Sequence, residues 1–160
     1  MGDHIRISAD GTHLFFNLEG DTIRFQAMAD LGEAWAVYEK HNMYIQGEVI
    51  SVEEVSILDT ITDLVKTISF HVMDAALNPL PHFLNNITLK FSENYGMVEA
   101  LNFIIFPLGN EIYFNLGFGS YTLTGMEGIE GGAQNLTWKD VYDYQPGDEL
   151  HIRNQHGKWN

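Results

Sequence analysis

Seven histidines and 22 carboxylates are the side chains that could support a metal site or acid–base chemistry in this chain. The histidines lack the paired spacing of a metal-binding motif such as His-Glu-x-x-His. His151 and His156 are five residues apart. The other five are scattered, at His4, His13, His41, His71 and His82. The sequence therefore predicts surface or structural histidines rather than a preformed zinc site.

Two groups of acids come nearest to a calcium site. Asp59 and Asp63 flank Thr-Ile-Thr, while Asp140, Asp143 and Asp148 gather towards the C-terminal end. Neither group has the spaced oxygen ligands of a calcium loop. Asp140 fits a capping residue better, and Asp148 fits a turn. We therefore expect no metal ligands among these acids.

The sequence also matches no catalytic motif. The stretch Gly117–Tyr121 reads Gly-x-Gly-Ser-x, whereas a nucleophile elbow requires Gly-x-Ser-x-Gly. The glycine-rich stretch 117–132 contains no Lys or Arg, and Glu127 and Glu130 would repel a phosphate. No carboxylate pair is marked for glycosidic chemistry. The sequence predicts no catalytic residue, no cofactor and no enzyme.

Two further features have a structural and a functional interpretation. Asn86-Ile87-Thr88 and Asn135-Leu136-Thr137 are formal glycosylation sequons that turn and cap chemistry explain equally well. Methionines and ten phenylalanines would either line a cavity for an apolar ligand or fill a core. We favour the core, because small barrels fill their interiors with side chains. The methionines in question are Met28, Met43, Met73, Met97 and Met126.

The composition excludes several classes of partner and chemistry. Eight basic against 22 acidic residues give a net charge of −14, which repels nucleic acid and anionic membranes. This charge favours solubility, or alternatively the attraction of cations. The absence of cysteine excludes disulfides, thiolate nucleophiles and iron–sulfur clusters. No apolar run approaches the ~20 residues of a membrane helix.

The elements that must position any site are β-strands. Ile87, Leu89 and Phe91 alternate with polar residues, residues 92–96 form a turn, and a strongly apolar second arm runs from Met97 to Pro107. Residues 56–63 are predicted to form a loop with one helical turn, and Gly47 to mark a bulge. The other strand-like segments are 4–8, 14–18, 22–29, 33–39, 42–54, 65–73, 112–118, 119–126 and 149–153.

These segments predict an all-β fold. We expect about ten short, mostly antiparallel strands in a sandwich or partly open barrel, with at most short helical turns. Residues 1–160 would form one domain, frayed at 1–3 and 154–160. Residues 137–152 are predicted to be a structural clasp rather than a site. The predicted buried residues are Phe25, Trp35, Ile68, Phe70, Leu89, Phe91, Phe103, Phe114 and Leu123.

Several short motifs, taken in order, resemble uncharacterised exported proteins of Bacteroidota. They are Thr62–Ile68, Phe91–Gly96, Tyr121–Gly125, Gln134–Tyr144 and Pro146–His151, and the resemblance covers roughly residues 62–152. Many such proteins carry a separate C-terminal sorting domain for type IX secretion. The resemblance implies a secreted or cell-envelope location and supplies no activity. On this resemblance we expect that a signal peptide has been removed and that the chain is an excised domain or a fragment without the sorting domain.

The functional expectation combines these points. The sequence favours a non-catalytic, exported or cell-surface β module that binds an unidentified protein, glycan or apolar ligand. The alternative is a carrier that holds an apolar ligand in a half-barrel. A hydrolase with an unmarked carboxylate site is the third interpretation.

Overall fold

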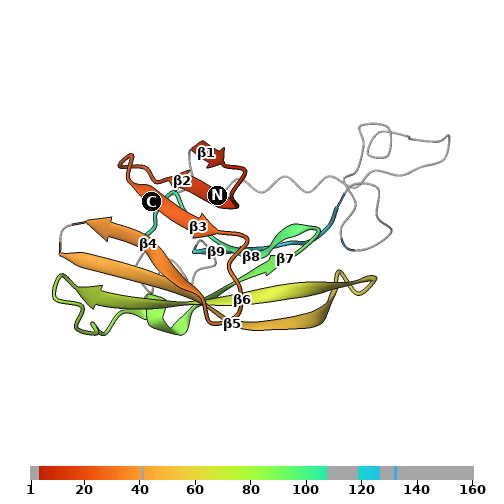
Figure 1. Ribbon diagram of the computed structural model, residues 1–160. Helices are drawn as coiled ribbons and strands as arrows, with labels where there is room; N and C mark the ends of the chain where they lie inside the picture. The colour runs from red at the N-terminus through yellow and green to blue at the C-terminus, as the bar shows by residue number, and fades with distance from the viewer. Residues whose placement is uncertain (1–3, 41, 108–118, 127–131, 133–160) are drawn as a thin grey trace, which may run out of the picture.

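The computed structural model describes residues 4–40, 42–107, 119–126 and 132. Within them lie nine strands and one short 3₁₀ helix, which confirms the all-β prediction. The strands form two antiparallel sheets that do not close into a barrel, so the fold is sandwich-like. Figure 1 shows the smaller sheet lying across one face of the larger.

The smaller sheet is formed from the predicted strand-like segments 4–8, 14–18 and 22–29. It contains β1 (His4–Ile7), β2 (Thr12–Phe16) and β3 (Thr22–Gln26), each paired antiparallel with the next. Gly11 and Gly20 occupy the two turns with φ of 80° and 79°, a backbone conformation that glycine adopts without a steric cost.

The larger sheet has six strands in sequence order and one short helix. It contains β4 (Ala34–Lys40), β5 (Met43–Ile57), β6 (Ile61–Asp74), β7 (Thr88–Ser92), β8 (Gly96–Leu101) and β9 (Ser120–Thr122). The 3₁₀ helix η1 (Phe83–Asn86) lies between β6 and β7. The β5–β6 hairpin extends the predicted strands 42–54 and 65–73 at the end where they are joined, and Figure 1 shows its tip projecting beyond the other strands.

The tip of this hairpin corrects the prediction for residues 56–63. That segment is no loop with a helical turn, because β5 continues to Ile57 and β6 begins at Ile61. Leu58 and Asp59 take positive φ values of 54° and 60°, and the Thr60 amide donates to the Ile57 carbonyl at 3.3 Å. Two consecutive left-handed residues match the twist of a tight hairpin.

Gly47 has a different role from the predicted bulge. It pairs in regular register with Trp35, whereas the irregularity in β5 falls between Val49 and Ser51. A Cβ at position 47 would lie 2.8 Å from Val37 Cγ2 and 3.1 Å from Trp35 Cζ2. Gly47 therefore makes room for the Trp35 indole to cross the sheet, where Nε1 donates to the Arg24 carbonyl at 3.0 Å.

The second arm of the 87–107 hairpin is also shorter than predicted. It ends as a strand at Leu101, and the chain then turns through residues 103–107. This turn places Phe103 and Phe106 in the core, with 2% and 3% of their surfaces exposed. The Phe103 ring packs 4.3 Å from that of Phe15, centroid to centroid. The apolar run thus joins the two sheets instead of extending one.

One hydrophobic core lies between the sheets and contains most residues predicted to be buried. Phe25, Ile68, Phe70, Leu89 and Phe103 are confirmed as buried. Trp35 and Phe91 are only half-buried and pack against this core, and Leu123 is half-buried just after β9, so the prediction overstated their burial. Phe114 lies outside the described residues, as do strands 112–118 and 149–153, the clasp 137–152 and the two frayed ends.

Polar contacts fix the two sheets against each other. Asn17, 3% exposed, donates from Nδ2 to the Phe106 carbonyl at 2.9 Å. The Asp21 carboxylate accepts from Lys40 Nζ at 2.6 Å and from the Tyr38 hydroxyl at 2.9 Å. Burial and the neighbouring Asp21 raise the pKa of Tyr38, so this hydroxyl remains a donor. The sheets are therefore held by directional bonds as well as by apolar packing.

Candidate functional site

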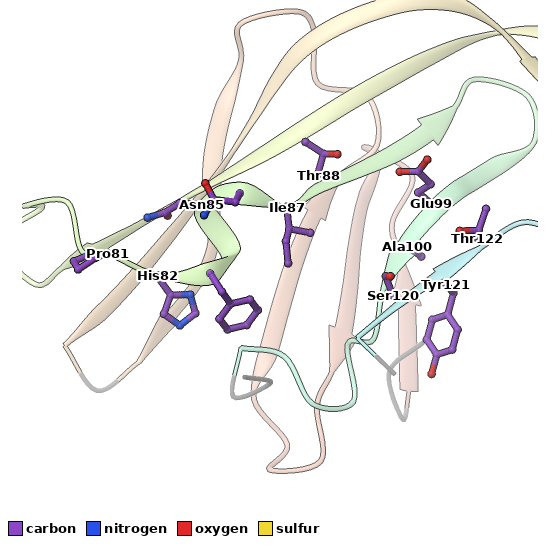
Figure 2. Close-up of a pocket in the computed structure, with 12 residues that line it drawn as sticks. Pro81, His82, Asn85, Ile87, Thr88, Glu99, Ala100, Ser120, Tyr121 and Thr122 are labelled. Atoms are coloured by element: carbon purple, nitrogen blue, oxygen red, sulfur yellow. The ribbon is translucent and has the colours of Figure 1, made fainter. Parts of the chain in front are cut away.

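A surface hollow of about 780 Å³ lies where the described parts of η1, β7, β8 and β9 meet. We call it the η1–β9 hollow. Pro81, His82, η1 and the start of β7 form one wall, and Glu99, Ala100 and β9 form the other. Figure 2 shows these two walls facing each other. The volume falls within the roughly 300–1,000 Å³ of small-molecule sites.

The hollow arises because β7 and β8 separate at one end. Their ladder runs from the Ser92–Gly96 pair to the Lys90–Glu99 pair, and the register goes no further. Beyond that point β7 continues with β6 as Ser69–Thr88, whereas β8 continues with β9 as Ala100–Tyr121. The hollow therefore opens beside the last pair of a ladder, between strands that have other partners.

The wall formed by η1 is held rigidly. His82 caps the helix with extended backbone, and its Nδ1 accepts from the Leu84 amide at 3.3 Å. Asn85 ties η1 to its neighbours, because Oδ1 accepts from the Val72 amide and Nδ2 donates to the Leu80 carbonyl, both at 2.8 Å. Leu84 is fully buried beneath. Side chains on this wall are thus presented from a fixed backbone.

Aromatic side chains stand on both walls. The rings of His82 and Phe83 lie 4.5 Å apart, centroid to centroid, at 34° to each other. Burial lowers the pKa of His82, which favours a neutral imidazole. Tyr121 projects from β9 on the opposite wall and is 46% exposed. An exposed aromatic ring on a paired strand is a surface against which a ligand can pack.

Polar side chains share one face of the sheet beside the gap. Glu99 pairs in register with Lys90 and with Thr122, which puts all three on the same face, and Thr88 lies two residues from Lys90. Lys90 Nζ contacts Glu99 Oε1 at 2.7 Å. This ion pair fixes the carboxylate at the rim, while Glu99 Oε2 accepts no hydrogen bond from the described residues.

The hollow contains the residue types of a hydrolase without their geometry. Ser120, His82 and Glu99 all line it. His82 Nδ1 is engaged by the Leu84 amide and Glu99 by Lys90, and within the described ranges no hydrogen bond joins Ser120 to His82. Nucleophilic catalysis requires a base within hydrogen-bond reach of the nucleophile. Among the described residues of the hollow, no such nucleophile–base pair is formed.

The structure does not bring the described histidines together. His13 lies between the rings of Phe25 and Phe91, at centroid distances of 6.0 and 6.2 Å, and burial lowers its pKa. His71 is exposed, with Nε2 3.3 Å from Glu48 Oε2. Across the described ranges, no three His, Asp or Glu residues gather as metal ligands would. His4 lies on β1, and the remaining histidines, His41, His151 and His156, fall outside those ranges.

Asp63 is the acid with the most distinctive surroundings. It is 8% exposed, and its carboxylate accepts from the Ser92 hydroxyl and from the Asn94 backbone and side-chain nitrogens, the latter two at 2.9 and 2.8 Å. Burial raises the pKa of Asp63, but the hydrogen bonds from Ser92, Asn94 and the Leu64 amide outweigh it and leave the pKa below its usual value. We call this cluster the Asp63 lock.

The lock has a structural role. Its oxygens bind the β7–β8 turn to β6, and the Leu64 carbonyl reinforces the join by accepting from the Glu93 amide at 2.9 Å. Asp59 is at the hairpin tip. The other acids considered for calcium, Asp140, Asp143 and Asp148, lie outside the described residues.

The other motifs take ordinary positions. Asn86 of the first sequon is exposed at the hollow, and Asn135 of the second is not described. Met43 and Met97 pack against the core. Ser120 of the failed elbow motif is exposed in β9. Sequence reasoning missed the hollow altogether, because its walls combine three separate segments, 81–88, 99–100 and 120–122.

No family model, curated protein or solved structure matches this chain. The class of protein rests on the fold and the hollow alone: an antiparallel, sandwich-like β protein with an open, ligand-sized recess at one end of the larger sheet. The described part of the chain has no helix with the length and apolarity to cross a bilayer.

Proposed function

We propose that the protein is a non-catalytic binding module that holds its ligand in the η1–β9 hollow. The observation that carries this proposal is a recess of about 780 Å³ with aromatic side chains on both walls. Its backbone is fixed before any ligand arrives, by the Asn85 bonds on one wall and by the β8–β9 ladder on the other. Preorganised walls reduce the entropic cost of binding.

The two alternative functions fit the hollow less well. An apolar carrier favours walls without charge, yet the Glu99 carboxylate lies at this rim beside two threonines. A hydrolase needs a base aimed at its nucleophile, yet no hydrogen bond among the described residues joins Ser120 to His82 or to Glu99. A binding role makes use of the same groups without further rearrangement.

The test is ligand-observed and protein-observed NMR on the isotope-labelled protein. Mixtures of sugars, fatty acids and short peptides should shift the amide signals of Ala100, Ser120 and Tyr121, and the compounds should be recovered unchanged. Ser120→Trp, which fills the hollow, should abolish these shifts, whereas Thr62→Trp on the exposed face of β6 should preserve them. No response at the hollow to any compound would overturn the proposal, as would turnover of one.

We also propose that the module works outside the cytoplasm. The support is the resemblance of residues 62–152 to exported proteins of Bacteroidota, together with an acidic, cysteine-free composition that needs no reducing compartment. Fractionation of the native cells, followed by immunoblotting, should find the protein in the envelope or the medium. A signal confined to the cytosolic fraction would refute this location.

A further inference from the structure

Resting on the proposed function, we infer that the ligand of the η1–β9 hollow is a neutral carbohydrate. The distribution of charge is the first reason. The residues that line the hollow include no Lys or Arg, and their one acidic side chain is Glu99. The nearby Lys90 is neutralised by that carboxylate at 2.7 Å, and the whole chain carries −14. Phosphates, fatty-acid carboxylates and acidic sugars would meet a repulsive field.

The second reason is the division of the hollow into a polar and an apolar side. Thr88, Glu99 and Thr122 stand on three neighbouring strands and share one face of the sheet. Ala100 and Tyr121 are paired with each other and therefore face the opposite way. Figure 2 shows Thr88 and Glu99 pointing to one side and Ile87 and Tyr121 to the other. A ligand in the gap between β7 and β8 meets both sides at once.

A pyranose ring has the matching distribution. Its edge carries hydroxyl groups that both donate and accept, and its C–H face is apolar. Glu99 Oε2 accepts no hydrogen bond from the described residues, so it is a fixed acceptor for a sugar hydroxyl. Thr88 and Thr122 flank it as donors and acceptors. The exposed Tyr121 ring presents a flat apolar surface to the C–H face.

The gap also offers backbone groups. Glu99 pairs with Lys90 at the last step of the β7–β8 ladder, so the alternation of an antiparallel pair directs the Thr88 and Leu101 peptide groups into the gap. The described register pairs neither residue across it. These N–H and C=O groups suit the hydroxyl groups, or an N-acetyl group, of a neutral sugar.

The experiment titrates the labelled protein with neutral di- and trisaccharides of glucose, galactose, mannose and N-acetylglucosamine. Parallel titrations use a glucuronate-containing disaccharide, a fatty acid and a lysine-rich peptide. A neutral sugar should shift the hollow signals, and Tyr121→Ala should weaken its binding at least tenfold. Tyr95→Ala, which removes a tyrosine that is 38% exposed on the β7–β8 turn, should leave binding unchanged. Glu99→Gln should weaken binding several-fold, and Glu93→Gln should not.

Each outcome bears on a separate statement. If the hollow responds only to the acidic sugar, the fatty acid or the peptide, the carbohydrate inference is wrong and the binding module remains. If the hollow responds to none of the compounds, both the carbohydrate inference and the proposed binding function are wrong. Equal affinity of the wild type, Tyr121→Ala and Glu99→Gln for a neutral sugar would also overturn the inference. Should Tyr121→Ala disturb the fold, Thr122→Val replaces it, and unchanged affinity in that variant would count against the inference in the same way.

Discussion

The Asp63 lock should contribute a large, pH-dependent part of the stability of the fold. Replacing Asp63 with Asn keeps the shape of the side chain and removes its charge. Asn has one acceptor oxygen where Asp63 has two, and it places an NH₂ donor at the other position. At least one of the three hydrogen bonds is therefore lost, and the rest become bonds between neutral groups. A bond to a charged group contributes about 1.5–3 kcal/mol and a neutral one about 1 kcal/mol. The expected loss in the free energy of unfolding at neutral pH is therefore at least about 2–3 kcal/mol.

The pH dependence of this loss tests the electrostatic part of the reasoning. The hydrogen bonds hold the pKa of Asp63 below its usual value of 3.8, so the folded state binds a proton less readily than the unfolded state. The stabilisation is fully present above that usual value and disappears as the pH falls through the lower pKa of the folded state. The difference in the free energy of unfolding between wild type and Asp63→Asn should shrink over the same pH interval.

Urea denaturation followed by tryptophan fluorescence, repeated from neutral pH downwards, measures both quantities. Asp59→Asn is the matched control: it removes the same charge from the tip of the same hairpin, where Asn also tolerates the φ of 60°. Its stability should stay within about 0.5 kcal/mol of wild type. A deficit in Asp63→Asn that does not shrink as the pH falls would refute the electrostatic account and leave packing as the cause.

Three further substitutions test the fold. Phe70→Ala, at a core position 2% exposed, should cost about 3–5 kcal/mol in urea denaturation, and a loss below about 1 kcal/mol would contradict its placement. Gly47→Ala should cost about 1–3 kcal/mol and alter Trp35 fluorescence, because the added Cβ meets Val37 and the indole; an unchanged emission spectrum would count against this contact. Asn17→Ala should cost about 3 kcal/mol, because it strands the Phe106 carbonyl and two turn amides. Wild-type stability in that variant would show that water replaces the side chain.

Sequence reasoning succeeded where a local rule acts alone. The N-terminal meander was predictable because Asp10-Gly11 and Glu19-Gly20-Asp21 are turn signals between alternating strands. The prediction for residues 56–63 was wrong because Leu seldom takes positive φ, so nothing in the sequence indicated that Leu58 would form a tight hairpin turn. The prediction of a bulge at Gly47 was wrong because glycine is needed there for a different reason, the size of the Trp35 side chain on the neighbouring strand.

The hollow could not be predicted from local sequence rules, for a different reason. Its walls depend on where one ladder stops and another begins, and hence on the pairing of β8 with β9 rather than with all of β7. His82 and Tyr121 line the same hollow only because of that strand pairing. The sequence predicted the strand 119–126, but no periodicity relates that strand to the segment around Pro81 and His82.

The Asp63 lock also has a consequence for self-association. Among the described strands, β6 is paired on both sides from Val65 to Ser69, and β5 alone pairs with the residues of β6 before Val65. The turn that Asp63 holds lies against this second edge, where the Leu64 carbonyl accepts from Glu93. Unpaired strand edges recruit strands from other molecules. Because Asp63 fastens a turn over this edge, we expect it to protect the β5–β6 hairpin from intermolecular strand pairing, and we expect that protection to weaken in acid when the carboxylate is protonated.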